Sequence, residues 1–477
     1  MANRSELNYP VRLLVILKYF GQLCLILSAL TVVPCIASLF FREYLYTLVY
    51  GLIVLATAIG GWLLSLLKAP QKMQVNEALV LVVGIFLFVP LMMSLPLMMS
   101  GLSFVDALFE AVSGATTTGL SMIEDVNAVP PLTLFARSWM QWYGGLGIVV
   151  FSLALLMSSG SVSKTLIKTG TEANDLVGGT KMHARRILYV YLLFTIVGVA
   201  GLLLLGINGS DTFSLVFASV STGGFAPYND SLASLGWGAQ TFIIALCFLS
   251  ATSLPFYHRL YKEKWKITMD AVQVSALFVC GLIAACALML FWAFDPAALL
   301  LAFSAQTTTG FSNVDVASLN PASKLILIVS MFIGGGIGST AGGIKILRLL
   351  IMIKVIASIV KKTATPAHAV EDTRIYHFKI QKSEQRNALI IIALFGVVIT
   401  LSWLPFIAMD YDPLDSLFEV VSATATTGLS AGVTAPELPV LLKLILCADM
   451  YLGRLEIVPW LVIASKMTWF GKRMEGS

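Results

Sequence analysis

The chain carries four copies of one short Thr/Gly-rich motif, distributed over most of its 477 residues. The copies read SGATTTGLS at 113–121, SVSTGGFAP at 219–227, SAQTTTGFS at 304–312 and SATATTGLS at 422–430. Aligned on one position, they place Gly119, Gly224, Gly310 and Gly428 in register. A motif that recurs at long intervals indicates a fold assembled from repeated units. The four copies are therefore expected to occupy equivalent places in the molecule.

The sequence between the motifs is too apolar for a soluble protein. Hydrophobic residues make up 58% of the chain and charged residues 12%, and the mean hydropathy is +0.87. Soluble domains contain roughly 45–50% apolar and about 25% charged residues. Because a membrane helix needs about 20 apolar residues, the chain has room for about ten. We predict an all-α integral membrane protein with about ten transmembrane helices and four re-entrant pore loops in a pseudo-fourfold arrangement.

The apolar stretches divide the chain into a leading pair of spans and four longer units. We expect a two-helix hairpin in residues 1–70. Each unit that follows consists of a full span, a shorter segment that ends in the motif, and a second full span. The expected boundaries are 75–159, 184–257, 267–357 and 387–468. The middle segments are too short to cross a bilayer.

Each middle segment opens with acidic residues, which favour a helix start. They are Asp106 with Glu110, Asp211, Asp295 before Pro296, and Asp415 with Glu419. We therefore expect four half-helices, each with an acidic cap and with its C-terminal end at the motif. That end of a helix carries a partial negative charge, so the arrangement favours a cation.

The basic residues fix the orientation, because Lys and Arg are enriched in cytoplasmic connections. All but five of the 31 basic residues lie at 1–18, 68–72, 164–186, 259–266, 345–386 and 466–473. The exceptions are Arg42, Arg137, Lys324 and Lys443 on the motif side, and Arg454 within a span. The motifs therefore face the outside. That side is rich in Asp and Glu, and an acidic surface concentrates cations.

The motifs suit a cation filter. A dehydrated cation needs oxygens in place of its water shell, and backbone carbonyls supply them without an unpaired charge. Glycine permits the positive φ angles that aim successive carbonyls at one axis, and threonine adds hydroxyl oxygens. One copy alone is better explained by close helix packing, but four copies on one side favour a filter. The candidate filter residues are Thr117, Thr118, Gly119, Thr222, Gly223, Gly224, Thr308, Thr309, Gly310, Thr426, Thr427 and Gly428.

A glycine-rich stretch, GGGIGSTAGGIK at 334–345, lies within the second span of the third unit. Interior glycines destabilise a helix, so a broken helix is expected there. Close packing against a neighbouring helix is the alternative. A phosphate-binding loop is disfavoured because GKS or GKT and a preceding strand are absent. The residues of interest are Gly334, Gly335, Gly336, Gly338, Ser339, Thr340, Gly342 and Gly343.

Arg454 lies in the last span with Asp449 and Glu456 nearby. A charge at membrane depth is costly and usually faces a partner or water. One interpretation is a network within the helix, although neither spacing is ideal for helical pairs. The other is an interaction with the glycine-rich stretch. We interpret Lys345 more simply, as a snorkelling or positive-inside residue at the cytoplasmic end of that stretch.

These motifs and this plan resemble the Trk/Ktr/HKT superfamily of potassium transporters, and most of all its bacterial TrkH type. The resemblance covers nearly the whole chain, including the leading hairpin. It implies that Gly119, Gly224, Gly310 and Gly428 are the filter glycines, that residues 334–345 form an intramembrane gating loop, and that Arg454 contacts this loop. In the superfamily a serine in place of the first glycine accompanies sodium preference, so Gly119 implies potassium.

The resemblance also implies partners and a location. It implies a homodimer in the bacterial cytoplasmic (inner) membrane, in contact with lipid, and a cytoplasmic TrkA-type regulatory ring. NAD or adenine nucleotides would bind that ring, and no organic cofactor is expected on this chain. Basic cytoplasmic segments also attract anionic lipid. No basic cluster interleaved with aromatics suggests nucleic acid.

Two other functions compete with a channel-like potassium pathway. The first is a sodium- or proton-coupled secondary transporter, but inverted repeats are typical of that class, whereas these repeats share one orientation. The second is a membrane-embedded enzyme, which needs a polar catalytic constellation. The candidate intramembrane charges are Asp449, Arg454 and Glu456, without a histidine or a metal-binding pattern. We therefore expect no enzymatic activity.

Overall fold

The computed structural model describes residues 10–70, 73–158, 176–263, 269–363, 373–376 and 378–470. Within these residues, the regular secondary structure is helical, apart from a short antiparallel pair, β1 (Arg374–Ile375) and β2 (Phe378–Lys379). Within them, six helices are long and apolar enough to cross a membrane, and one further pair of helices is bent by 86° at a break. The predicted all-α membrane fold is confirmed.

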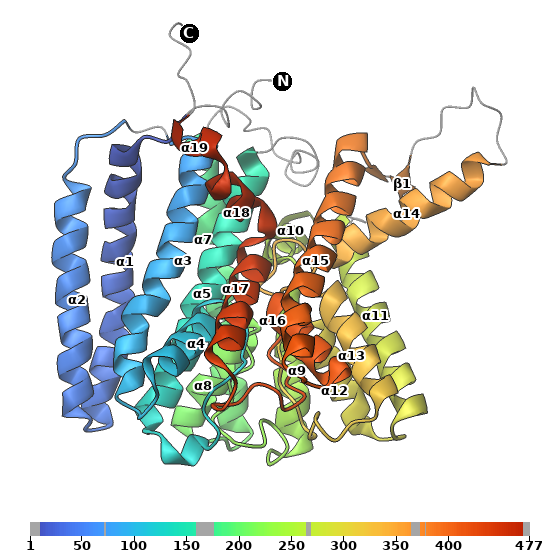
Figure 1. Cartoon of the computed structure of the whole chain (residues 1–477), viewed down its shortest axis with the longest axis horizontal. Helices are drawn as coiled ribbons and strands as arrows, with labels where there is room; N and C mark the ends of the chain where they lie inside the picture. Colours follow the sequence, from blue (N-terminus) through green and yellow to red (C-terminus); the bar gives the residue numbers. More distant parts are fainter. Residues whose placement is uncertain are drawn as a thin grey trace, which may run out of the picture.

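The leading hairpin consists of α1 (Leu13–Phe40) and α2 (Tyr44–Ser65), which stand at one edge of the molecule (Figure 1). The two helices cross closely at Gly21 and Gly61, where a Cβ on either residue would lie 2.7 Å from the other's carbonyl oxygen. The outer face of α2 is apolar and exposed, as at Leu48, Leu52 and Leu55. Such a face suits contact with lipid.

Four units follow, each with a long helix, a half-helix and a second span. The first contains α3 (Val75–Met98), α4 (Phe104–Ala115), the 3₁₀ turn η3 (Val126–Ala128) and α5 (Pro131–Ser158). The second contains α7 (Leu176–Leu204), α8 (Gly209–Ser221), α9 (Trp237–Ala251) and α10 (Leu254–Glu263). The third contains α11 (Met269–Phe291), α12 (Pro296–Gln306), α13 (Pro321–Ile333) and α14 (Ile346–Lys362). The fourth contains α15 (Lys382–Ala408), α16 (Pro413–Thr424), α17 (Val440–Leu455), α18 (Ile457–Ala464) and α19 (Lys466–Phe470).

The half-helices α4, α8, α12 and α16 have 12, 13, 11 and 12 residues. At 1.5 Å per residue they are roughly 17–20 Å long, which is shorter than the roughly 30 Å membrane core. All four lie in the same half of the molecule (Figure 1). They therefore enter the membrane from one side without crossing it.

The expected acidic caps are only partly right. Asp295 caps α12 by accepting the Ala297 N–H, with Pro296 in the first turn. The cap of α16 is Asp412 rather than Asp415, and the cap of α4 is the Ser103 hydroxyl rather than Asp106. Asp106, Asp211 and Asp415 lie in the first turns of their helices, where a negative charge still interacts favourably with the helix dipole.

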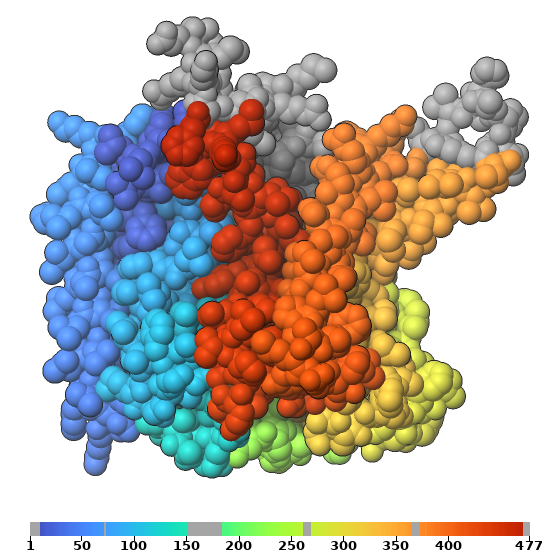
Figure 2. Space-filling model, in the orientation of Figure 1, coloured from blue at the N-terminus to red at the C-terminus, as the bar shows by residue number. Residues whose placement is uncertain are grey.

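The second spans differ in continuity. The helix α5 runs unbroken through its unit, whereas α9 and α10 are separated at Thr252 and Ser253. Residues 334–345 separate α13 from α14, and Glu456, with a φ of 61°, separates α17 from α18. Beyond its break, α14 projects away from the body of the protein, as Figure 2 shows. Three second spans are thus broken and one is not.

Polar side chains join each unit to the next near the outer ends of the second spans. Three of them, Arg137, Lys324 and Lys443, are basic residues on the motif side, and all three are buried. We call the four contacts the interunit braces. They are Arg137 to the Ala226 carbonyl (2.7 Å), Asn313 to Gln240 (3.3 Å), Lys324 to Asp415 (2.6 Å) and Lys443 to Asp106. The last brace joins the fourth unit to the first, so the units form a closed circle.

We expect Lys443→Met to destabilise the protein, because it leaves the Asp106 carboxylate without its cation. Removing one partner of a buried ion pair costs about 3–5 kcal/mol. The midpoint of thermal unfolding in detergent should fall by several degrees. Lys443→Met combined with Asp106→Asn removes both charges and should recover most of the loss. Equal midpoints for the single and double variants would contradict the brace.

Candidate functional site

The four Thr/Gly motifs meet at the C-terminal ends of the half-helices and close into one ring. A Cβ atom at each aligned glycine would overlap a carbonyl oxygen of the next motif, so the backbones touch there. The contacts run from Gly119 to Gly223, from Gly224 to Thr309, from Gly310 to Thr427 and from Gly428 to Thr118. Because the last contact returns to the first motif, the motifs enclose a single axis. We call these glycines and their partner carbonyls the glycine ring.

The backbone takes the same unusual conformation in all four motifs. Each glycine has a positive φ, between 78° and 96°, and so does the threonine two residues before it, between 49° and 53°. These threonines are Thr117, Thr222, Thr308 and Thr426. A positive φ is rare for a β-branched residue and costs about 1–3 kcal/mol. Strain repeated at four equivalent positions marks this place as a candidate functional site.

The threonine hydroxyls of the motifs are buried, and three of them have no hydrogen-bond partner. These are the Oγ1 atoms of Thr117, Thr426 and Thr427. A buried hydroxyl normally has a partner. Unpartnered oxygens beside the glycine ring are therefore available to a cation. The site offers backbone and hydroxyl oxygens, and over the described residues no group of three His, Cys, Asp or Glu is placed to hold a metal ion.

A cavity of about 460 Å³ lies on the outer side of the ring, and all four aligned glycines line it. Its wall includes the carboxylates of Glu124, Asp230 and Asp315. Between the lining residues Glu124 and Val126, hydrogen bonds from the Asn229 side chain and from Asn127 lower the pKa of Asp125. The entrance therefore carries negative charge, which attracts cations.

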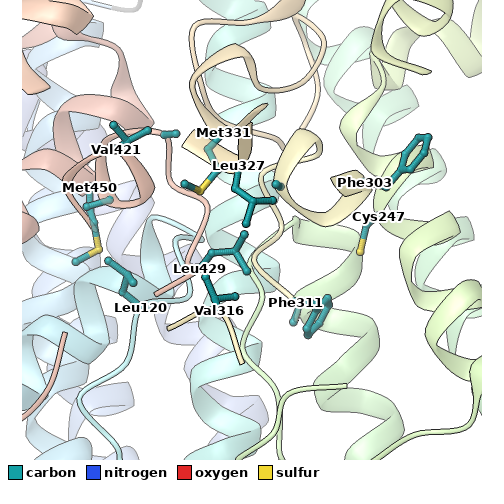
Figure 3. Packing of buried hydrophobic residues seen from close by; sticks show 14 of the residues in the cluster. Leu120, Cys247, Phe303, Phe311, Val316, Leu327, Met331, Val421, Leu429 and Met450 are labelled. Carbon is teal, nitrogen blue, oxygen red and sulfur yellow. The ribbon is translucent and has the colours of Figure 1, made fainter. Parts of the chain in front are cut away.

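Large apolar side chains anchor the strand that leaves each glycine. They are Leu120, Phe225, Phe311 and Leu429, each at most 2% exposed. Figure 3 shows Leu120, Phe311 and Leu429 among the labelled residues of the buried hydrophobic cluster. In the first motif the Ser113 hydroxyl also accepts the Gly119 N–H (3.0 Å). In the fourth motif the Ser422 hydroxyl accepts the Gly428 N–H (3.0 Å). These contacts hold the strained backbone in place.

Glu110 and Glu419 have a different position from the expected helix starts. Both are fully buried in the middle of their half-helices. Glu110 accepts the Met122 N–H (2.9 Å) and pairs with Arg137 (2.9 Å). Glu419 accepts the N–H groups of Ala431 (2.8 Å) and Val433 (3.2 Å). Each glutamate thus ties the strand that leaves the ring back to the half-helix that leads into it.

The glycine-rich loop, residues 334–345, lies directly against the inner side of the ring. The Gly342 N–H donates to Thr308 Oγ1 (2.6 Å), and the Gly343 N–H donates to the Ala425 carbonyl (3.1 Å). The hydroxyls of Thr222 and Thr340 are 3.2 Å apart. A Cβ on Gly342 would overlap the Ala425 carbonyl. The helix is thus interrupted, and glycine also permits close packing.

The breaks in two other second spans hold this loop from both sides. At the α9–α10 break, the Ala251 carbonyl accepts the Gly336 N–H (2.9 Å), and the Leu254 N–H donates to the Gly338 carbonyl (3.1 Å). Within the loop, the Ser339 hydroxyl donates to the Gly336 carbonyl (2.6 Å). At the α17–α18 break, Arg454 donates to the Thr340 carbonyl (2.6 Å). The loop therefore lies between two interrupted helices.

The interpretation of Arg454 as part of a network within its helix is wrong. Asp449 instead accepts the Ser402 hydroxyl (2.6 Å), and Glu456 pairs with Arg348 of α14 (2.7 Å). Arg454 is 5% exposed, and its Nε and second terminal nitrogen have no hydrogen-bond partner. A buried guanidinium with two unpartnered nitrogens places uncompensated positive charge beside the loop.

Sequence reasoning missed the roles of Lys345, Arg348 and Glu456. Lys345 does not snorkel, because its ammonium donates to the Ala341 carbonyl within the loop. Arg348 holds Glu456 through two hydrogen bonds, of 2.7 and 2.8 Å, across 108 residues of sequence. Two charged residues at the end of a span, Arg454 and Glu456, indicate a buried polar site in the sequence. They do not identify the partners, Thr340 and Arg348.

Comparisons with known proteins agree with this architecture. The TrkH family model, described as a cation transport protein, matches residues 49–291 and 296–472. An uncharacterized cation transporter of Methanocaldococcus jannaschii is 32% identical over 460 residues, which is 94% of each chain. The Trk system potassium uptake protein TrkH of Escherichia coli K12 is 27% identical over 482 residues, covering 95% of this chain and 99% of that one.

The fold also matches a crystal structure, that of the potassium transporter TrkH from Vibrio parahaemolyticus. The TM-score is 0.85, with 96% of this chain and 100% of the other covered. Sequence identity in this match is 22%, so the comparison establishes the fold alone.

We expect Glu419→Leu to lower the thermal unfolding midpoint markedly, because it removes the acceptor for two backbone N–H groups and two hydroxyls. Leaving buried donors unpaired costs about 1–3 kcal/mol each. Glu437→Leu, on the exposed outer connection of the same unit, is the matched control and should change the midpoint little. Similar midpoints for both variants would show that Glu419 does not support the ring.

Proposed function

The chain belongs to the TrkH family of cation transport proteins, and on this premise we propose that it takes up potassium ions through a channel-like pore whose filter is the glycine ring. It is a multi-pass protein of the cytoplasmic membrane. Several relatives are named as Trk potassium uptake proteins. Transport, rather than catalysis, is the activity that family membership supports.

The closed contact between the four motifs carries the proposal. Four strained strands meet around one axis, with unpartnered hydroxyls beside them and an acidic cavity above. Non-helical backbone at membrane depth is tolerated only where it is buried in protein or lines a water-filled path. The half-helices direct their negative C-terminal ends to the same place. Each feature stabilises a cation that has lost its water.

The proposed route runs from the acidic cavity through the ring to the glycine-rich loop and then to the cytoplasm. The inward negative membrane potential supplies about 2.3 kcal/mol per charge per 100 mV. The loop is the proposed gate, because it covers the inner end of the ring. Arg454 helps keep it closed, since it holds the Thr340 carbonyl and repels cations.

The proposed partners act at the cytoplasmic side. A TrkA-type ring that binds NAD or adenine nucleotides would dock on the basic connections, and the basic segments would also attract anionic lipid. The projecting helix α14 begins directly after the proposed gate and leads to that side, so a partner that binds α14 would be connected to the loop through this helix. We also propose a homodimer.

One observation favours the alternative of proton coupling. Asp449 is fully buried, and its Oδ2 atom has no hydrogen-bond partner. Ionisable residues inside the membrane commonly bind or relay protons. A pH gradient imposed across proteoliposomes at zero membrane potential distinguishes the two mechanisms, because it drives potassium accumulation only if protons are coupled.

We expect Gly310→Ser to reduce potassium flux into proteoliposomes by roughly tenfold or more and to change the ratio of K⁺ to Rb⁺ and Na⁺ flux. The side chain would overlap the Thr427 carbonyl, and the φ of 85° is unfavourable for serine by about 1–2 kcal/mol. Gly51→Ser is the control, since that glycine has open space around it. Unselective or absent cation flux in the wild-type chain, even with a regulatory partner added, would contradict the proposal.

We expect Arg454→Ala to raise basal potassium flux several-fold, because it removes both the hydrogen bond to the loop and the positive charge. Arg454→Gln keeps a donor without the charge and should give an intermediate flux. Arg42→Ala, at an exposed outer turn, serves as the control. Unchanged flux through correctly folded Arg454→Ala protein would exclude this role.

A further inference from the structure

The second motif lacks the residue that the other three share at three aligned positions: Ala226 replaces a serine, and the other two positions precede Gly224. Gly223 occupies the position of Thr118, Thr309 and Thr427, and Ala218 occupies the position of Ser113, Ser304 and Ser422. Gly223 is not among the residues with positive φ. Its backbone would therefore accept a side chain, and the lack of one requires another explanation.

The side chain of Gln141, from α5, fills the space that a side chain at Gly223 would need. A Cβ on Gly223 would lie 2.6 Å from Gln141 Oε1 and 2.8 Å from its Nε2. Both distances are shorter than real Cβ contacts. Gln141 is itself fully buried. The Gln141 side chain therefore occupies the space that a threonine at position 223 would fill, so the two residues depend on each other.

Gln141 also forms two hydrogen bonds to the second strand, but with other backbone groups than the glycine N–H that serines accept in the first and fourth motifs. Its Nε2 donates to the Gly223 carbonyl, and its Oε1 accepts the Phe225 N–H at 3.2 Å. These two groups lie on either side of Gly224, the aligned glycine of this motif. The amide therefore fixes the backbone of the second strand through both a donor and an acceptor.

The helix that carries Gln141 is held firmly at this level. The Tyr191 hydroxyl donates to the Trp142 carbonyl (2.8 Å), and Trp142 donates to Thr195 (3.0 Å). The rings of Trp139 and Trp142 stack at 4.8 Å. Gly144 packs so closely on α4 that a Cβ there would overlap the Ala115 carbonyl. Gln141 thus transmits the position of a fixed helix to the ring.

We propose that Gln141 is a positioning residue that determines the cation selectivity of the second strand of the ring. The Gly223 carbonyl is one of the four ring carbonyls and lies against Gly119. Without the amide, this carbonyl and the Phe225 N–H lose their partners, and the strand gains freedom beside Gly224. A ring in which one of the four strands is mobile discriminates less well between ions of different size. This inference rests on the proposed filter function.

The first test is Gln141→Met, which keeps the length and volume of the side chain but removes both hydrogen bonds. The variant should retain cation flux, with the K⁺ to Na⁺ flux ratio in proteoliposomes reduced by roughly threefold or more. Gln385→Ala is the matched control, because Gln385 also donates to a backbone carbonyl, that of Ile380 (3.0 Å), but at the cytoplasmic end of α15. A wild-type ratio in Gln141→Met would overturn the proposal.

The second test changes Gly223 and Gln141 together. Gly223→Thr alone should abolish most of the flux, because the new side chain overlaps Gln141. Gln141→Ala with Gly223→Thr gives the second motif the threonine of the other three and should recover flux above the Gly223→Thr level. A double variant no better than Gly223→Thr would overturn the proposal. So would loss of folded protein in both the double variant and Gln141→Met, since it would leave Gln141 a purely structural role.

The wild-type chain and Gly310→Ser, measured in the same experiment, separate this inference from the proposed function. If the wild type passes potassium selectively and Gly310→Ser alters it, the filter stands and the Gln141 variants judge the inference alone. If the wild type passes no cation, the filter proposal itself fails.

Discussion

The contact between each aligned glycine and a carbonyl of the next motif is the constraint on which the structure depends. It allows four backbone strands to meet at one axis, and no side chain fits between them. The strands are strained, so they need support from outside the ring. Leucine and phenylalanine anchors, buried glutamates and the interunit braces supply that support. The half-helices and spans can be understood as the frame that keeps four unfavourable backbone segments in contact.

The glycine-rich loop extends the same logic to the inner side. Its carbonyls and N–H groups lie at membrane depth, where water is scarce and each unpaired group is costly. The neighbouring spans satisfy them by breaking at the same level, which frees their own backbone groups for pairing. Among the second spans, as far as the structure describes them, only α5 of the first unit continues unbroken past this level. It contributes Gln141 to the ring instead, so the four units are alike in plan but divided in their tasks.

Much of the architecture was predictable from the sequence, because hydropathy and a repeated motif are local signals. They indicated the membrane fold, the half-helices, the residues that meet in the ring and the interruption after Ile333. Contacts between distant segments were not predictable in this way. Nothing local pairs Arg348 with Glu456, places Gln141 against Gly223, or turns Glu419 towards Ala431. Charge counting also identified Lys324 and Lys443 as exceptions to the positive-inside rule, but only the folded chain shows that burial and ion pairing explain them.

The closure between the fourth motif and the first has a consequence for how the protein is made. Gly428 meets Thr118, and Lys443 meets Asp106, across more than 300 residues of sequence. Chains generally fold from the N-terminus during synthesis, so the circle is completed only when the last unit enters the membrane. Until then the first three motifs have no contact with the fourth, and the ring stays open. A nascent or truncated chain therefore lacks the closed ring that we propose as the filter.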